Sequence, residues 1–455
     1  MQGRKSKKIR VMSTLIFSLF LFLGMGAAFA GVCFQPADNY QAGVGPSSII
    51  SADFNNDNIA DLAVTNQNDD DVSIFLGNGD GTFGGKTDYS VGDFPTSLTA
   101  ADFNHDGNLD LAVTNFSHFD VSILLGNGDG TFGQSTDFNV DPLPAGITAA
   151  DFNNDGNVDL ATTSQGFHSV TILIGNGNGT FSQTGTLSTG LFPHGITAAD
   201  FNSDGNVDLA VTNAFDDDIS VFLGNGDGSF QPKNDFAVGN SPQDITAADF
   251  NNDGILDLAV SNENDADVSV LLGNGDGTFG AKNDFAAGLG PLGITSGNFD
   301  NDGNVDLVVV NSANNNVSLL LGNGDGTFQP KTDFAVGSGP VDITAADFDA
   351  NNKLDISTAN QNSANISILL QEVYCPGNTS SGLSGTQLLI SSNSKSATAA
   401  LQKRLTELGF NPGPIDGSYG FKTKQAVMEF QKSRGLTADG IVGPKTSAAL
   451  WSNPK

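Results

Sequence analysis

The sequence predicts an all-β, seven-bladed β-propeller with four-stranded blades, followed by a small all-α domain of three helices. An acidic segment, DFNNDGNVDL at 151–160, recurs in seven copies whose first residues are always 49 positions apart. Each repeat also contains four short runs typical of strands, and a repeat of this kind is typical of propeller blades. The last 60 residues change to helical spacing, which indicates a second domain.

The strands of one blade are clearest in the sixth copy, Pro291 to Gly339. Four segments there, ITSGNF, DLVVVN, VSLLLGN and TFQPKTDFAVG, are rich in β-branched and apolar residues and are bounded by Gly, Asn, Asp or Pro. Nothing in the repeat has helical spacing. We therefore expect each blade to bury its faces against its neighbours in a ring that removes long free edges.

The ends of the array favour a closed ring over an open solenoid, which is the main alternative. The seventh copy stops after ISILL at 366–370 and never reaches its fourth strand. Residues 33–40 match the missing piece, because they correspond to 327–334 of the sixth copy. The N-terminal segment is therefore expected to supply the fourth strand of blade seven.

The two cysteines, Cys33 and Cys375, fall on adjacent positions of the repeat frame at this seam. Adjacent Cα atoms are ~3.8 Å apart and disulfides prefer ~4.4 to 6.8 Å, so the chain ends need to separate only slightly. An exported protein meets oxidising conditions. We expect a Cys33–Cys375 disulfide that joins the ends of the ring, with two free thiols as the alternative.

Residues 1–30 have the pattern of a signal peptide. Five basic residues precede an apolar run from Val11 to Gly24, and Ala28-Phe29-Ala30 forms a small-x-small cleavage signal. The mature chain is expected to begin at Gly31; an uncleaved membrane anchor is the alternative, although the run is short for a span. The expected domains are the propeller at 31–375, a flexible Ser/Gly/Asn/Thr-rich linker at 376–395 and a C-terminal domain at 396–455.

Charge is divided unevenly along the chain. Residues 31–394 carry 47 acidic and five basic side chains, a net charge of −42, whereas residues 395–455 carry a net charge of +5. A segment with this much negative charge repels nucleic acid and anionic membranes, and we therefore expect neither as a partner. No membrane insertion is expected after signal cleavage. Self-repulsion of this size also destabilises a compact fold unless cations neutralise it.

The repeated acidic loop has the oxygen spacing of a calcium site. In Asp-x-Asn-x-Asp-Gly-x-x-Asp, side-chain oxygens at positions 1, 3, 5 and 9 converge with the main-chain carbonyl of position 7, as in the first part of an EF-hand loop. All-oxygen ligands select a hard cation, and Ca²⁺ tolerates this coordination better than Mg²⁺. We expect up to seven Ca²⁺ ions; the alternative is that Asp and Asn only cap turns. The expected ligands are Asp53, Asn55, Asp57, Ile59, Asp61, Asp102, Asn104, Asp106, Asn108, Asp110, Asp151, Asn153, Asp155, Asn157, Asp159, Asp200, Asn202, Asp204, Asn206, Asp208, Asp249, Asn251, Asp253, Ile255, Asp257, Asn298, Asp300, Asp302, Asn304, Asp306, Asp347, Asp349, Asn351, Lys353 and Asp355.

Two other positions of the loop refine this expectation. Position 7 varies between Ile, Asn and Lys, as expected when only its carbonyl is used. Position 6 is Gly in five copies and Asn58 or Asn352 in the outer copies, which suits a turn with φ above zero. The bidentate Glu of an EF-hand is absent, so we expect weak affinity, with Kd on the order of 10⁻⁴ to 10⁻³ M.

The loop and its spacing resemble the FG-GAP or VCBS repeat family, which occurs in integrin α-subunit propellers and many secreted bacterial proteins. The resemblance covers Gly31 to about Tyr374. It implies a seven-bladed propeller with Ca²⁺ in the loop that joins the first and second strands. The first copy departs from the pattern at Asn58, and the seventh departs at Asn351 and Asn352.

A second turn, GNGDGTF, recurs in six copies. It lacks the Lys-Ser/Thr and the following helix of a phosphate-binding loop, so we interpret it as a hairpin turn. In a four-stranded blade this turn and the calcium loop fall at the same end. The other two connections therefore share the opposite face.

The connections on that opposite face vary in ways that the scaffold does not require. Copies two to four carry aromatic and histidine residues there, whereas copies five to seven carry Asn-rich segments. Aromatic residues on loops over a rigid scaffold commonly bind ligands, so we expect a ligand patch; neutral variation or local packing is the alternative. Its residues are Phe116, His118, Phe119, Phe167, His168, Phe192, His194 and Phe215.

The C-terminal domain has apolar residues at helical spacing in 401–408 and 426–430, and Pro444 suits the first turn of a third helix that runs to Trp451. The segments LQKRLTELGF, NPGPIDGSYGFKTKQAVMEFQKSRGL and ADGIVGPKTSAAL, with paired Asp-Gly turns, resemble the three-helix peptidoglycan-binding domain of bacterial cell-wall hydrolases. The positive charge suits an acidic wall polymer. The residues expected to contact it are Tyr419, Lys422, Gln431 and Arg434.

No catalytic constellation accompanies these features. His105 falls inside a calcium loop, the cysteines belong to the seam, and no nucleophile is paired with a base. We expect a non-enzymatic, exported, calcium-binding propeller anchored to peptidoglycan, at the bacterial cell wall, in the periplasm or outside the cell. Its free face would serve adhesion or bind a protein or glycan. The alternatives are a lectin-like polysaccharide-binding protein and an accessory subunit of a cell-wall or polysaccharide hydrolase.

Overall fold

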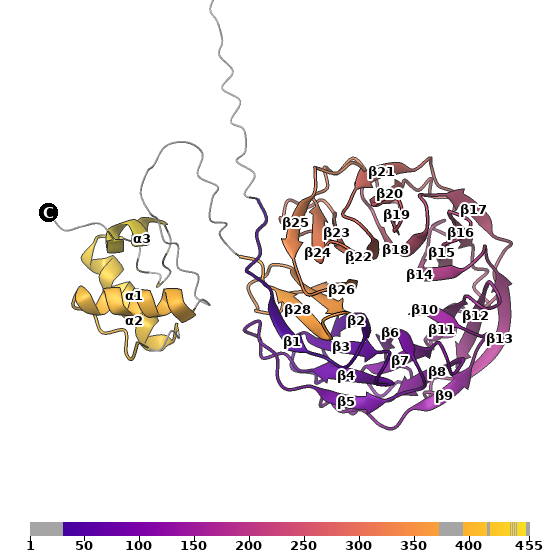
Figure 1. Ribbon diagram of the computed structural model, residues 1–455, viewed down its shortest axis with the longest axis horizontal. Coiled ribbons are helices and arrows are strands. Elements are labelled where there is room, and N and C mark those ends of the chain that lie inside the picture. The colour runs from indigo at the N-terminus through magenta and orange to yellow at the C-terminus, as the bar shows by residue number, and fades with distance from the viewer. Residues whose placement is uncertain are drawn as a thin grey trace, which may run out of the picture.

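A computed structural model describes residues 31–372, 395–415, 419–436, 438, 440, 442 and 444–451. Seven four-stranded antiparallel sheets form the blades of a closed ring (Figure 1). This confirms the predicted seven-bladed propeller. The expected signal peptide and the expected linker up to residue 394 lie outside the described residues, and no described helix is long and apolar enough to cross a membrane.

The blades follow the chain in order, each running from its innermost strand outward. Their strands are, for blade one, β2 (Pro46–Ala52), β3 (Asp61–Asn66), β4 (Asp71–Phe75) and β5 (Thr87–Ser90); for blade two, β6 (Pro95–Ala101), β7 (Asp110–Asn115), β8 (Asp120–Leu124) and β9 (Thr136–Asn139); for blade three, β10 (Pro144–Ala150), β11 (Asp159–Ser164), β12 (Ser169–Gly175) and β13 (Phe181–Ser188); for blade four, β14 (Pro193–Ala199), β15 (Asp208–Asn213), β16 (Asp218–Phe222) and β17 (Asn234–Ala237). Blade five has β18 (Pro242–Ala248), β19 (Asp257–Asn262), β20 (Asp267–Leu271) and β21 (Asn283–Ala286); blade six has β22 (Pro291–Gly297), β23 (Asp306–Asn311), β24 (Asn316–Leu320) and β25 (Thr332–Ala335); blade seven has β26 (Pro340–Ala346), β27 (Asp355–Asn360), β28 (Asn365–Leu369) and β1 (Asp38–Gln41).

The second strand of every blade is buried on both faces, and this explains why apolar residues stand next to one another in the strand without alternating with polar ones. In β3, DLAVTN, all six residues are buried. Leu62 and Val64 pack in the cluster shared with blade seven, whereas Ala63 packs in the cluster shared with blade two. The hydrophobic core is therefore a set of layers between neighbouring blades, and no blade can bury its apolar faces alone.

The fourth strands are shorter than the sequence suggested. In blade six, β25 covers only Thr332–Ala335, and Phe328 forms a separate bridge with Gly322 at the hairpin turn. Blade three differs, because β13 runs from Phe181 to Ser188 without a break. The first strands also begin earlier than expected, at the proline that opens β22.

The ring closes as predicted, through the N-terminal strand. β1 pairs antiparallel with β28, with Asp38 opposite Ile368, and Phe34 bridges Gln371. The N–H of Glu372 donates to the carbonyl of Cys33 at 2.9 Å. Cys375 lies outside the described residues, so the Cys33–Cys375 disulfide stays a prediction.

The C-terminal domain contains α1 (Lys395–Glu407), α2 (Phe421–Ser433) and α3 (Pro444–Trp451), as the apolar spacing predicted. Leu401 and Leu405 of α1 pack against Val427 and Phe430 of α2 in a small buried cluster. Leu450 of α3 completes that cluster.

Candidate functional sites

The acidic loop folds onto its own carboxylates. In blade three, the two side-chain oxygens of Asp151 accept the N–H groups of Asp155 and Gly156 at 3.2 and 2.8 Å. Asn153 Oδ1 also accepts from the N–H of Asp155, and Asp155 Oδ1 accepts from the N–H of Asn157. These bonds turn the side-chain oxygens of positions 1, 3 and 5 toward the middle of the loop, and most of them recur in the other blades.

Backbone angles confirm the turn expected at position 6. Its five glycines have φ between 83° and 96°, and Asn58 and Asn352 adopt 63° and 62°. Position 4 also has φ between 56° and 61° in all seven copies, which the sequence analysis missed. The frequent Asn at position 4 was the available signal, since Asn tolerates this conformation better than most residues.

The aspartate at position 9 ties the loop to the hairpin turn. Asp61 is fully buried; its Oδ2 accepts from the N–H of Phe54 at 3.0 Å and its Oδ1 from the N–H of Gly77 at 2.8 Å. Burial outweighs these bonds and raises the pKa of Asp61 to about 6, with smaller contributions from Asp57 and Asp53. A nearby cation would favour the ionised form.

In blades six and seven, the residues present fit a bound divalent cation. Six buried side-chain oxygens have no hydrogen-bond partner among the described residues, and two of them, Asn298 Oδ1 and Asn351 Oδ1, are expected ligand atoms. Such atoms normally find a partner, so an ion would satisfy them. In blade seven, oxygens of Asp347, Asp349 and Asp355 lie within 4.8 Å of one another. This grouping occurs in a copy that departs from the family pattern.

Four pairs of neighbouring loops are joined by the position-4 side chain of one blade and the position-7 side chain of the next. Asn154 Nδ2 donates to Asn206 Oδ1 of the next blade at 2.9 Å, and the same bond recurs from Asn56 and Asn252. His105 fills this place in blade two, with Nε2 2.9 Å from Asn157 Oδ1. Position 7 therefore uses its side chain as well where it is Asn, a role that sequence reasoning missed.

The opposite face carries every large hydrophobic residue that is exposed in the described propeller. Phe119, Phe167 and Phe215 are 41%, 65% and 68% exposed on the turns between second and third strands. Val44, Leu191 and Leu289 are exposed on the connections between blades.

The structure does not gather the eight expected patch residues into one surface. Only Phe116 and His194 line a cavity at the ring centre. Phe192 and Phe215 stack on each other, with ring centroids 4.5 Å apart, and His118 Nδ1 lies 3.7 Å from Asp120 Oδ2.

His168 has a structural role on this face. Its Nδ1 accepts the N–H of Phe192 at 3.1 Å. The same repeat position in three other blades also accepts a main-chain N–H from the connection to the next blade. Its residues there are Asp70, Asp217 and Asn315. Local packing therefore accounts for this histidine.

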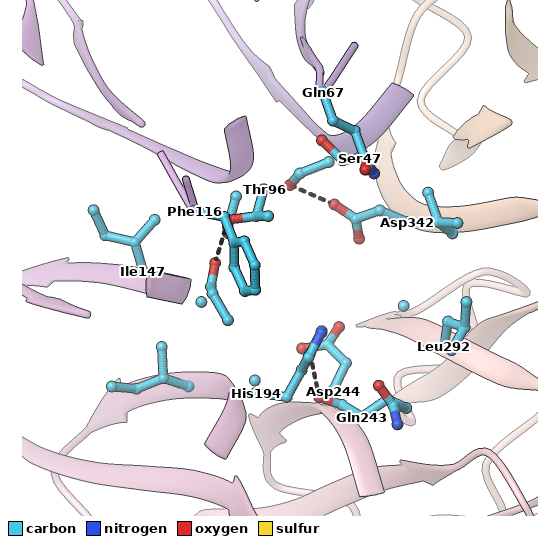
Figure 2. Close-up of a pocket in the computed structure, with 18 of the residues that line it drawn as sticks. Ser47, Gln67, Thr96, Phe116, Ile147, His194, Gln243, Asp244, Leu292 and Asp342 are labelled. Carbon is cyan, nitrogen blue, oxygen red and sulfur yellow. Dashed lines mark hydrogen bonds between the residues drawn. The ribbon is translucent and has the colours of Figure 1, made fainter. Parts of the chain in front are cut away.

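The cavity opens at the centre of the ring and has a volume of about 450 Å³. It is lined by the starts of the innermost strands and by the turns that follow the second strands, and Figure 2 shows these side chains around an open space. One repeat position contributes from every blade, and we call these residues the mouth ring: Ser47, Thr96, Ala145, His194, Gln243, Leu292 and Val341.

In the C-terminal domain, the four expected wall contacts differ in accessibility. Gln431 is buried, and its amide donates to Thr446 Oγ1 and accepts from the N–H of Gly440. Tyr419 is half-buried and its hydroxyl donates to the carbonyl of Gly440 at 2.9 Å. Lys422 and Arg434 are exposed. Gln431 therefore holds the domain together, whereas Lys422 and Arg434 are open to a polymer and Tyr419 is partly so.

Comparison with known families identifies the propeller and the C-terminal domain separately. The FG-GAP-like repeat profile matches six overlapping segments, 53–113, 110–162, 151–211, 200–260, 249–309 and 298–357, more than half of the chain. The chain belongs to the FG-GAP-like repeat family. Residues 394–450 of this FG-GAP propeller protein match the putative peptidoglycan binding domain. The recognised propeller family and the domain at the C-terminus are thereby confirmed.

The amidases among the curated relatives match only the peptidoglycan-binding part of the FG-GAP protein. N-acetylmuramoyl-L-alanine amidase CwlM of Mycobacterium tuberculosis is 49% identical over 53 residues, 12% of this chain and 13% of its own length. N-acetylmuramoyl-L-alanine amidase CwlL of Bacillus licheniformis is 49% identical over 59 residues, 12% of this chain and 16% of its own length. The matched segment spans less than a fifth of either amidase.

Among solved structures, a streptogramin B lyase resembles the FG-GAP propeller with a TM-score of 0.54 at 17% identity, over 76% of this chain and 99% of the lyase. At this identity the likeness shows the fold alone. The chain thus combines a propeller with a peptidoglycan-binding domain. Together they support binding to the cell wall.

Proposed function

We propose that this protein is an exported, calcium-binding, non-enzymatic propeller that its C-terminal domain anchors to peptidoglycan. The face opposite the calcium loops is left for a protein or glycan ligand. The observation that carries the proposal is the presence, in one chain, of an FG-GAP propeller and a peptidoglycan-binding domain. Export belongs to the proposal because peptidoglycan lies outside the cytoplasmic membrane.

Calcium is supported by charge and by the geometry of the loops. Bound Ca²⁺ would supply positive charge where residues 31–394 carry −42. Positions 1, 3 and 5 hold their oxygens inward through main-chain N–H groups, as at Asp151 and Asp155. Position 9 joins the loop to the hairpin turn, as Asp61 does. Seven such loops would stiffen one whole face of the ring.

A non-enzymatic role is supported by the histidines. His105, His168 and His194 contact an asparagine oxygen, a main-chain N–H and the carbonyl of Gln243, respectively. His118 lies near a carboxylate. Within the described residues, none of the four is hydrogen-bonded to a hydroxyl or thiol that it could activate as a nucleophile.

Anchoring is tested by cosedimentation of the mature chain with purified sacculi. Lys422→Glu combined with Arg434→Glu reverses two exposed charges of the C-terminal domain and should reduce the retained fraction severalfold, because an acidic polymer is then repelled. Lys282→Glu combined with Lys331→Glu makes the same charge change on the propeller and should leave retention unchanged.

The same experiment in EDTA distinguishes wall binding by the C-terminal domain from any wall binding that depends on the calcium loops. EDTA should lower the melting temperature of the propeller while the C-terminal domain still holds the chain on the sacculi. Retention that EDTA abolishes and the Lys422/Arg434 variant preserves would place wall binding on the propeller and contradict the proposal.

A further inference from the structure

The cavity at the ring centre lies on the face that the proposed function leaves for a ligand. Its seven-residue mouth ring has a different residue in every blade, from Ser47 to Val341. Two positions later, every blade has Ile or Leu, as at Ile49 and Leu98, because those side chains fill the layers between blades. The mouth ring has no such constant residue, although Leu292 and Val341 still pack against the layers between blades. Its lack of symmetry would hold a ligand in one orientation.

Three glutamines provide hydrogen-bonding groups that the protein itself does not use. Gln67, Gln165 and Gln361 occupy the same position in blades one, three and seven, and all three line the cavity. Among the described residues, none of their side-chain amides has a hydrogen-bond partner. Each amide offers two donors and one acceptor. The cavity wall can therefore bind a ligand that both donates and accepts hydrogen bonds.

An aromatic pair stands beside these amides. In blade two the same position is Phe116, whose ring lies 5.9 Å from that of Phe94, tilted by 51°, and both rings line the cavity. Phe94 has φ of 59°, a conformation rarely adopted by bulky residues. Aromatic faces next to neutral hydrogen-bonding groups suit a ring that has apolar C–H faces and hydroxyl edges.

Charge narrows the class of ligand. No described lining residue is Lys or Arg, whereas Asp244 and Asp342 are present. Their carboxylates are held by the next blade, since Asp244 Oδ2 accepts the N–H of Ile294 at 3.0 Å and Asp342 Oδ2 accepts that of Ile49 at 2.9 Å. Burial and the charge of Asp342 raise the pKa of Asp244 to about 7. An anionic ligand would find no counter-charge here and two acidic groups.

We propose that this cavity binds a short segment or terminal unit of a neutral glycan, with the amides of Gln67, Gln165 and Gln361 bonded to its hydroxyls and the Phe94/Phe116 pair against a sugar ring. A volume of about 450 Å³ lies within the range of ~300 to 1,000 Å³ that is typical of small-ligand sites. This inference rests on the proposed function and gives its binding face a position and a ligand class.

The test uses the mature full-length chain in calcium on an array of immobilised neutral glucans, N-acetylhexosamine oligomers and uronate oligomers. Gln67→Met with Gln361→Met preserves side-chain volume and removes hydrogen bonding, and Phe116→Ala removes an aromatic face. Phe215→Ala is the matched control, because Phe215 is exposed on the same face and does not line the cavity. Melting temperatures confirm that each variant is folded.

We expect binding to at least one neutral oligosaccharide, weakened by about tenfold or more in the Gln67/Gln361 variant and in Phe116→Ala, and unchanged in Phe215→Ala. Binding only to uronates, no neutral glycan bound, or equal binding by the cavity variants and the control would each overturn the proposal. Sacculus retention of the Lys422/Arg434 variant is measured separately, so a failure of anchoring is distinguishable from a failure of the cavity site.

Discussion

The side-chain amide of Gln371 donates a 2.7 Å hydrogen bond to the main-chain carbonyl of Phe299. Elsewhere in the ring, the equivalent phenylalanine carbonyl accepts from a glycine N–H in the hairpin turn of the next blade, as Phe250 does from Gly326 at 3.0 Å. The chain leaves blade seven before this turn can form. One glutamine side chain therefore replaces a main-chain donor at the seam of the ring.

Gln371→Ala should destabilise the propeller by about 1–3 kcal/mol, because it leaves the carbonyl of Phe299 without its partner in a buried place. The measurement is urea denaturation in the presence of calcium. Gln361→Ala is the control; its amide has no described partner, so the change should stay within about 0.5 kcal/mol. Equal stability of the two variants would show that closure does not depend on this bond.

Calcium should stabilise the protein more near neutral pH than in mild acid. Burial raises the pKa of Asp61 and Asp159 to about 6 and that of Asp355 to about 7, from an ordinary value of 3.8. In metal-free protein their contribution to stability is complete below pH ~4 and is lost as the pH rises through ~6 to 7. Bound Ca²⁺ favours the ionised form and should reverse this trend.

Scanning calorimetry in EDTA and in CaCl₂ tests this expectation. The rise in melting temperature caused by calcium should be larger at pH about 7.5 than at pH about 5, where protons compete for the carboxylates. An equal rise at both values would mean that these aspartates do not hold the ion.

Asn298→Asp should strengthen calcium binding in blade six. Asn298 Oδ1 is buried without a described partner at position 1, where the other six loops have Asp. A carboxylate adds a charge and an oxygen, so the affinity of this loop should rise by roughly one order of magnitude. Asn301→Asp at position 4 adds the same charge and should have a smaller effect. Calcium titration of both variants shows whether Asn298→Asp strengthens binding because the new carboxylate ligates the ion or only because it adds negative charge.

The Cys33–Cys375 disulfide should be present in the oxidised mature protein. The carbonyl of Cys33 is bonded to the N–H of Glu372, three residues before Cys375. Such a bond would close a loop that contains most of the propeller, and its reduction should lower the free energy of unfolding by about 2–4 kcal/mol. Peptide mapping without reduction checks the pairing. Alkylation of both thiols in unreduced protein would contradict it.

His168→Ala should destabilise blade three by about 1 kcal/mol, since the N–H of Phe192 loses its acceptor. His168→Asn should retain most of the stability, because Asn315 performs the same role in blade six. Melting temperatures of the two variants provide the comparison. If Asn and Ala were equally destabilising, the imidazole would be required for something other than this hydrogen bond.

The sequence by itself determined the number of blades, the closing strand, the acidic loops and the helices of the second domain. The physical reason is locality: each blade contacts only its neighbours, so a 49-residue period and the unfinished seventh copy define the ring. The turn at Asn58 could likewise be predicted, since few residues tolerate its φ of 63°.

Only the tertiary structure decided which side chains meet. Gln67 and Gln361 are almost 300 positions apart and share a cavity because the ring closes. His168 and Gln431 looked available for ligands, yet hydrogen bonds to distant main-chain groups commit them to structure. Spacing shows which loop a residue belongs to, whereas the packing of neighbouring blades and helices decides whether its polar atoms face protein or open space.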